Sequence, residues 1–340
     1  MARFISDTNK VVMLSESGTY AVPDTTGKWI GQVQEHALEE NENLLISRYL
    51  GNANRSYGKI DAGPQDVNGT LTYYPQDMNL MAHALGSVYQ TVATNTTKNE
   101  AWAVNNNVWQ NPFCSGTTKQ TESTLPYSFT IEDSKTSAGT GKNFIRTVKG
   151  ACINTATLTL TQGEKASCEV AYNAQHSIFS SGNTTSVTAY TNRPYLWSDA
   201  SLTMVGSPIS NAKEVSLEIN NNLESPHYIN GSRVIGASFQ GNREITLSVT
   251  ADASAERCQM LYDEYYKGGS EFNITLDLNA DITATGSQHA IFYMSGCRIQ
   301  SMDIPSPLEG VNEFSFEAIT GSINMTDYTN KNVVGSYNLY

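Results

Sequence analysis

The 340-residue sequence has no long hydrophobic run, and this absence limits where the protein can work. Nowhere do eighteen apolar residues follow one another, so no transmembrane helix is predicted. The N-terminus, MARFISDTNK, contains no apolar stretch long enough for a signal peptide. We therefore expect a soluble protein that is made in the cytoplasm and does not enter a membrane.

Basic residues are also scarce. The 21 Lys and Arg residues stand against 33 Asp and Glu residues, which leaves a net charge of −12. No basic cluster could neutralise phosphates in number, so tight nucleic-acid binding is not expected. A negatively charged surface repels DNA. This repulsion suits a protein that DNA must slide past without sticking.

The cysteines are too few and wrongly spaced for a disulfide framework or a zinc site. Their number is odd, and no CxxC pair occurs. We expect them to be buried thiols that pack as small apolar side chains. They are Cys114, Cys152, Cys168, Cys258 and Cys297.

The patterns of common active sites are missing. There is no HExxH and no GxSxG, and the segment GTGK at 139–142 fails as a phosphate loop because Asn143 follows it. The acidic pairs Glu39-Glu40 and Asp263-Glu264 are better explained as solvated charge. We therefore predict a protein that is not an enzyme, with no catalytic, cofactor-binding or metal-binding residues and no cofactor. The histidines are scattered: His36, His83, His176, His227 and His289.

The aromatic residues allow two interpretations. Trp102, Trp109, Trp197 and the Tyr265-Tyr266 pair could line a glycan or ligand site, but Trp in β proteins more often fills a core or an interface. We favour the core or interface role. Without an active-site pattern, a structural or interaction role is the better hypothesis.

Short alternating runs rich in Thr, Val, Ile and Tyr, separated by Asn, Ser and Gly, predict a mainly β protein with many turns. The length favours two domains, although one large β domain is also possible. The phrase GACINTATLTL at 150–160 resembles GCRIQSMDI at 296–304, and the two cysteines lie 145 residues apart. The same offset pairs 129–131 with 274–276, and Glu164 with Glu309.

Two further matches lie upstream. LEENENL at 38–44 resembles LEINNNL at 217–223, and in 70–86 and 246–268 a strand pattern ends at an Asp-containing turn before a helix that ends at Gly. We therefore predict two copies of one unit, each with a strand, a long hairpin, a strand, a short helix and three strands. The predicted segments are an N-terminal arm (1–27), a first domain (28–172, with an insertion at about 91–124), a linker (173–193), a second domain (194–322) and a C-terminal arm (323–340).

The turn region of the first hairpin, NANRSYGKIDAGPQD, is polar and longer than a tight turn requires. Two interpretations stay open: a loop that reaches a neighbouring molecule and a mobile surface loop.

Four stretches resemble the tail tube proteins, or major tail proteins, of tailed bacteriophages and tailed archaeal viruses. They are 29–51, 63–87, the phrase that begins at Gly150, and RPYLWSDASLTM at 193–204. The resemblance implies two tandem tail-tube-like β-sandwich or half-barrel domains, each with a short flanking α-helix. It also implies a structural virion protein whose rings stack into a hollow tail tube, assembled in the host cytoplasm.

The implied partners are other copies of the chain, a tail terminator, a baseplate or tip, and a tape-measure protein, with DNA passing through the lumen without specific binding. Rings in this family commonly present six copies of the fold. Two copies per chain would then give rings of three chains with pseudo-sixfold symmetry, and rings of six chains are the alternative.

A rival interpretation is a secreted or surface adhesive or surface-layer protein made of two immunoglobulin-like sandwiches. The missing signal peptide and the helix predicted in each copy argue against it. A glycan-active enzyme is a third possibility, and it lacks a convincing acid and base pair.

Overall fold

The computed structural model confirms a mainly β, antiparallel fold. It describes residues 4–16, 20–25, 27–48, 57–85, 89–92, 100–105, 128–137, 143–182, 184–187, 189–190, 192–280, 288–306 and 312–327. Within these residues no helix is both long enough and apolar enough to cross a membrane.

In the first half of the chain, most of the strands belong to two sheets. The two sheets share one long strand, β10. Its elements are β1 (Phe4–Ser15), β2 (Gly27–Lys28), β3 (Gln32–Asn41), β4 (Leu45–Ser47), β5 (Lys59–Asp61), β6 (Asp66–Tyr74), α1 (Asn79–Leu85), β7 (Tyr89–Val92), β8 (Glu100–Asn105), β9 (Phe129–Ser137), β10 (Asn143–Thr161), β11 (Ser167–Ala174) and β12 (His176–Ser180). One sheet has the order β2-β1-β9-β10-β12, and the other has the order β3-β6-β11-β10.

The second half follows the same plan around β18. Its elements are the 3-10 turn η1 (Trp197–Asp199), β13 (Ala200–Met204), β14 (Ser207–Pro208), β15 (Ala212–Asn220), β16 (Glu244–Asp252), α2 (Ala255–Met260), the π-helical turn η2 (Leu261–Lys267), β17 (Phe272–Asn279), β18 (His289–Asp303), β19 (Glu313–Ile319) and β20 (Ser322–Asp327). Its sheets have the orders β14-β13-β17-β18-β20 and β15-β16-β19-β18, which match those of the first half strand for strand.

The long strand changes sheets at a glycine in each half. Gly150 and Gly296 have φ of 64° and 65°, a conformation that favours glycine. Before Gly150, β10 pairs with β9 and β12; after it, β10 pairs with β11 and β15. Ala151 and Cys297, which follow the two glycines, pair with Phe129 and Phe272 at the start of the preceding strands. Cys297 therefore corresponds to Ala151 and not to Cys152. The constant offset found in the sequence does not align equivalent positions of the two long strands.

A buried carboxylate holds the bend in β10. Glu16, just after β1, accepts hydrogen bonds from the backbone N–H groups of Gly150 and Ala21, both at 2.8 Å. It also accepts hydrogen bonds from the hydroxyls of Ser128 and Thr130, both at 2.6 Å. One side chain thus connects β1, β9 and the bend, so we expect it to fix the angle between the two sheets.

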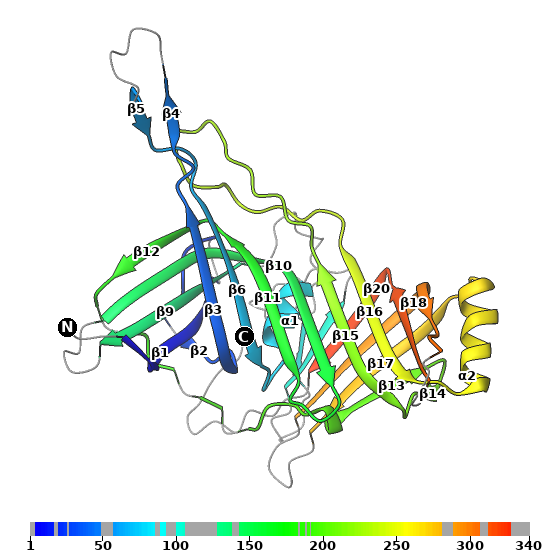
Figure 1. Cartoon of the computed structure of the whole chain (residues 1–340). Coiled ribbons are helices and arrows are strands. Elements are labelled where there is room, and N and C mark those ends of the chain that lie inside the picture. The colour runs from blue at the N-terminus through cyan, green and yellow to red at the C-terminus, as the bar shows by residue number, and fades with distance from the viewer. Residues whose placement is uncertain are drawn as a thin grey trace.

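One sheet continues from the first half into the second. The second part of β10 pairs with β15 along 155–161, so the strands run β3-β6-β11-β10-β15-β16-β19-β18 without interruption (Figure 1). We call this the continuous sheet. At the junction Leu158 lies opposite Leu217, and both are fully buried. The two halves are therefore joined by a backbone ladder and by core side chains.

The core lies against the inner side of this sheet. The predicted burial is confirmed for Cys152, Cys168 and Cys297, whereas Cys258 is half-buried and Cys114 lies outside the described residues. Helix α1 inserts five buried side chains into the core: Leu80, Met81, Ala82, Ala84 and Leu85. Both predicted short helices are present.

Parts of the predicted arms and linker belong to the sheets. In the expected N-terminal arm, β1 pairs with β9, and Val12 and Met13 are buried. In the expected linker, β12 pairs with β10, and β20 reaches Asp327 in the expected C-terminal arm. The described part of the expected insertion contains β8, which pairs with β20 of the second half.

His83 on α1 is half-buried, with its Nδ1 atom shielded from solvent, and this burial lowers its pKa to about 3. Lys28 contributes further to the lower pKa. In the unfolded chain a histidine takes up a proton near pH 6.5, whereas the folded protein keeps His83 neutral. Protons therefore favour the unfolded state between these two values.

Replacing Glu16 with Leu should lower the free energy of unfolding by about 3 kcal/mol, because buried N–H and O–H donors lose their acceptor. Urea unfolding at pH 7 measures the change. Glu169→Leu, on the exposed side of β11, is the matched control and should change stability by less than about 0.5 kcal/mol. Equal effects of the two variants would contradict a role for Glu16 at the bend.

Lowering the pH from 6.5 to 4.5 should remove about 2 to 3 kcal/mol of stability through His83, because the folded-state pKa is depressed. His83→Leu should reduce this pH dependence, because the leucine side chain takes up no proton in either state. Urea unfolding of dilute protein at both pH values provides the measurement. Identical pH profiles of wild type and His83→Leu would show that His83 is not the cause.

Candidate assembly surfaces

The outer side of the continuous sheet is acidic. The inward positions of its strands are mostly apolar and buried, and the alternate positions point outward. One outward row crosses most of the sheet, because each residue lies opposite the next in the strand register. The row is Glu35, Thr72, Glu169, Thr157, Glu218 and Thr246.

Other carboxylates occupy neighbouring rows. The register places them outward on the same strands: Glu39, Asp66, Glu214, Glu244, Asp252, Glu313, Glu317 and Asp303. Two cations lie on these strands, Lys213 at a register shift and Arg298 just after the bend. Both are paired: Lys213 with Asp252 and Glu313, at 2.6 Å each, and Arg298 with Glu271, at 2.9 Å. The described sheet therefore presents a face of carboxylates and hydroxyls with little free positive charge.

The continuous sheet has an open edge on each side. Within the described residues β3 pairs only with β6, and the part of β18 from Arg298 onward pairs only with β19. Open edges carry unpaired backbone N–H and C=O groups and invite a further strand. The side chain of Ile304, next to the β18 edge, is 40% exposed, and Leu38 on β3 is only partly buried. These edges are candidate association sites.

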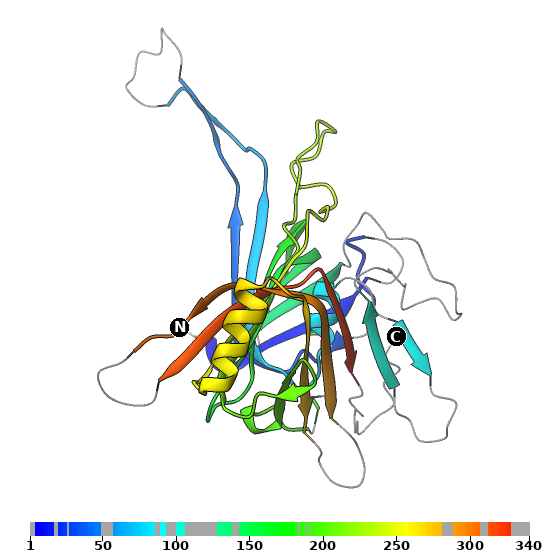
Figure 2. The same cartoon turned by 90° about the vertical axis from the view of Figure 1, so that its right-hand side faces the viewer.

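A hairpin formed by β4 and β5 projects beyond one end of the sheet (Figures 1 and 2). Ile46 and Ile60 are cross-strand partners with exposed fractions of 50% and 52%. Leu44, Leu45 and Tyr57 are also exposed. Isolated two-stranded hairpins are marginally stable in water. Exposed apolar side chains on a projecting element indicate contact with another molecule.

The loop 221–243 of the second half supports the base of this hairpin. The Nε2 atom of His227 lies 2.8 Å from Asp66, and Arg233 donates from Nε to the carbonyl of Gly63 at 2.8 Å. Arg233 also pairs with Glu42. The second half therefore holds the hairpin of the first half in place.

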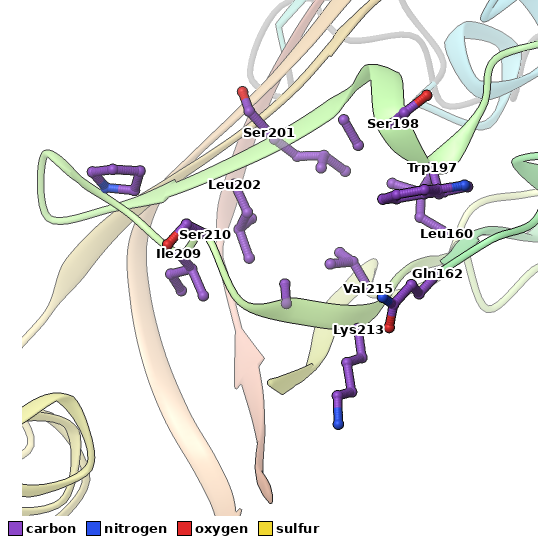
Figure 3. Close-up of a pocket in the computed structure, with 14 residues that line it drawn as sticks. Leu160, Gln162, Trp197, Ser198, Ser201, Leu202, Ile209, Ser210, Lys213 and Val215 are labelled. Carbon is purple, nitrogen blue, oxygen red and sulfur yellow. The ribbon is translucent and has the colours of Figure 1, made fainter. Parts of the chain in front are cut away.

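A pocket of about 360 Å³ lies between the end of β10 and the start of the second half (Figure 3). The strands β13 and β14, which help to line it, lie at the end of the molecule away from the hairpin (Figure 1). The Trp197 ring, 44% exposed, lies across one side of it (Figure 3). Its lining is mostly apolar and includes Leu160, Leu202, Ile209, Val215 and Leu276. The predicted interface role of Trp197 stays a prediction, with this pocket as its location.

One buried polar cluster has the residue types of a catalytic relay. His36 Nε2 lies 2.7 Å from the Tyr172 hydroxyl, and His36 Nδ1 lies 3.5 Å from Asp133. Burial alone would raise the pKa of Asp133, but His36, Lys135 and Arg146 lower it. The side chains of His36 and Asp133 are 3% and 4% exposed, so a substrate cannot reach them. The cluster connects β3 to the neighbouring sheet.

The remaining residues considered from the sequence do not come together. Tyr265 is buried and Tyr266 is partly buried against the core. Trp109 and the segment 139–142 lie outside the described residues, and only the backbone of Trp102 is described, in β8. Among the residues that the structure covers, no three His, Cys, Asp or Glu side chains form a group that could hold a metal ion.

A family model described as phage tail tube protein matches residues 9–318. The matched span begins in β1 and ends in β19, so it includes both halves and the β10–β15 junction. No curated protein matches the chain.

Proposed function

Since the chain belongs to the family of phage tail tube proteins, which are structural components of the virion tail, we propose that three chains form a ring and that rings stack into the hollow tube through which viral DNA passes. The observation that carries this proposal is the continuous sheet, which joins two similar halves and leaves an open edge on each side.

The count of three follows from the two halves. Their strand orders match, so we propose that they are two copies of one unit. A ring of three chains then presents six units with pseudo-sixfold symmetry, and the continuous sheet contributes eight strands from each chain. Closure of the ring would cover both open edges of the continuous sheet.

The acidic face suits the wall of the lumen. Glu35, Glu169 and Glu218 share one row, so like charges repeat across the sheet. A wall of carboxylates repels DNA phosphates, and hydroxyl side chains between them keep the surface wetted without cationic anchors. DNA would therefore pass without specific binding.

The two ends of the ring differ, which gives the tube a direction. The projecting hairpin lies at one end, and β13 and β14, which help to line the Trp197 pocket, lie at the other (Figure 1). In a stack of rings with one orientation, the hairpin of each ring meets the pocket-bearing end of the next. The tail terminator and the baseplate or tip would meet opposite ends, the tape-measure protein would lie in the lumen, and assembly would take place in the host cytoplasm.

Electron microscopy of the purified protein tests the proposal. We expect rings or tubes in negative stain, and mass photometry of rings should give three times the chain mass of 37.1 kDa. A ring mass equal to six chain masses would show that the ring contains six chains and not three. Isolated two-lobed particles at all concentrations would contradict the tube and favour a two-domain adhesive protein.

Replacing Ile46 and Ile60 together with Asp should block stacking but leave rings intact, because charge replaces the apolar pair on the hairpin. Tube length in negative stain gives the readout, with ring mass as the test of folding. Ile178→Asp, at an exposed position of β12, is the matched control and should preserve tubes. Tubes of normal length from the double variant would show that the hairpin does not take part in stacking.

A further inference from the structure

We infer that the open edge of β18 in one chain pairs with the open edge of β3 in the next chain, in the register of the β10–β15 junction. This inference rests on the proposed ring and specifies its contact. The occupant of each edge is a second copy of this chain, because the contact already exists once inside every chain. The next unit around the ring would repeat it.

The position of β3 in this contact follows from its partner strand. Asn41 of β3 pairs with the first residue of β6, and Asn220 of β15 pairs with the first residue of β16. Leu38 lies three residues before Asn41, and Leu217 lies three residues before Asn220. The two leucines therefore occupy equivalent positions in β3 and β15. Both leucines lie on the inward side of the sheet.

The position of β18 follows in the same way. After the bend, both long strands carry a register shift at the same place, before Thr155 in β10 and before Ser301 in β18. Ser301 therefore corresponds to Thr155. Three residues further along, Ile304 corresponds to Leu158.

These correspondences define the register of the contact between chains. Leu158 opposite Leu217 becomes Ile304 opposite Leu38 of the next chain. Inside the chain this apolar pair is fully buried, whereas Ile304 is 40% exposed in the single chain. Pairing would cover it, which supplies an apolar contribution in addition to the backbone ladder.

Two features make the contact between chains weaker than the one inside the chain. Asp303 would lie opposite Glu39, where the internal junction has Thr157 opposite Glu218, so two carboxylates meet on the acidic face. Pro305 has no N–H to donate and shortens the ladder. Because exposed like charges are screened by salt, we expect rings to form more readily at higher ionic strength.

Cysteine cross-linking of assembled rings tests the register. In the variant Ser301→Cys with Asn41→Cys, the two thiols would face each other across the contact, at the spacing of a cross-strand pair. Oxidation should link most chains into a covalent trimer on a non-reducing gel. Thr155→Cys with Asn220→Cys is the matched positive control, because these residues are partners inside the chain. Ser301→Cys with Ala37→Cys, four residues out of register, should remain near background.

The outcomes separate the two proposals. Wild-type protein that never forms rings would overturn both the proposed function and this contact. Rings in which the internal pair cross-links while Ser301→Cys with Asn41→Cys stays at background would overturn the register alone. Ile304→Asp provides a second check: it should give folded single chains by circular dichroism and mass photometry, and normal rings from it would also overturn the contact.

Discussion

The bend in β10 is the constraint on which the rest of the structure depends. A strand can pair with two neighbours at any point, and by changing sheets at Gly150 this strand pairs with four. Its first part closes the core of the first half, and its second part offers an edge to the second half. Glu16 holds the bend from the end of β1, and in the second half the Asn273 side chain accepts from the N–H of Gly296 at 3.4 Å.

The continuous sheet connects this bend to assembly. Strand periodicity places apolar side chains on the core side and carboxylates on the other side, so a single register sets both the packing of the core and the charge of the exposed face. A slip by one residue would bury Glu218 and expose Leu217. The same register fixes which groups stand at the open edges. Core packing, the proposed lumen and ring closure are therefore not independent features.

The sequence predicted the β class and both helices, because turn residues and local periodicity are short-range signals. The sequence aligned Cys297 with Cys152, whereas the shared feature is the glycine at the bend, where a positive φ favours glycine. The β1 segment was expected to be an arm because its buried face shows only after pairing with β9. The acidic row was not predictable, since Glu35, Glu169 and Glu218 come from separate strands that the register alone aligns.

The two halves differ where the proposed tube needs to depart from sixfold symmetry. The first half carries the projecting hairpin, and the second half carries the loop 221–243, whose Arg233 and His227 contact the base of that hairpin. If a second long hairpin replaced the loop 221–243, those contacts would be lost. The hairpin formed by β4 and β5 would then lose its support. In the proposed ring, the two unequal halves of each chain place every hairpin beside a supporting loop. Six separate chains carrying one identical unit could not enforce the alternation of that proposed ring, which gives a physical reason for carrying both halves in one chain.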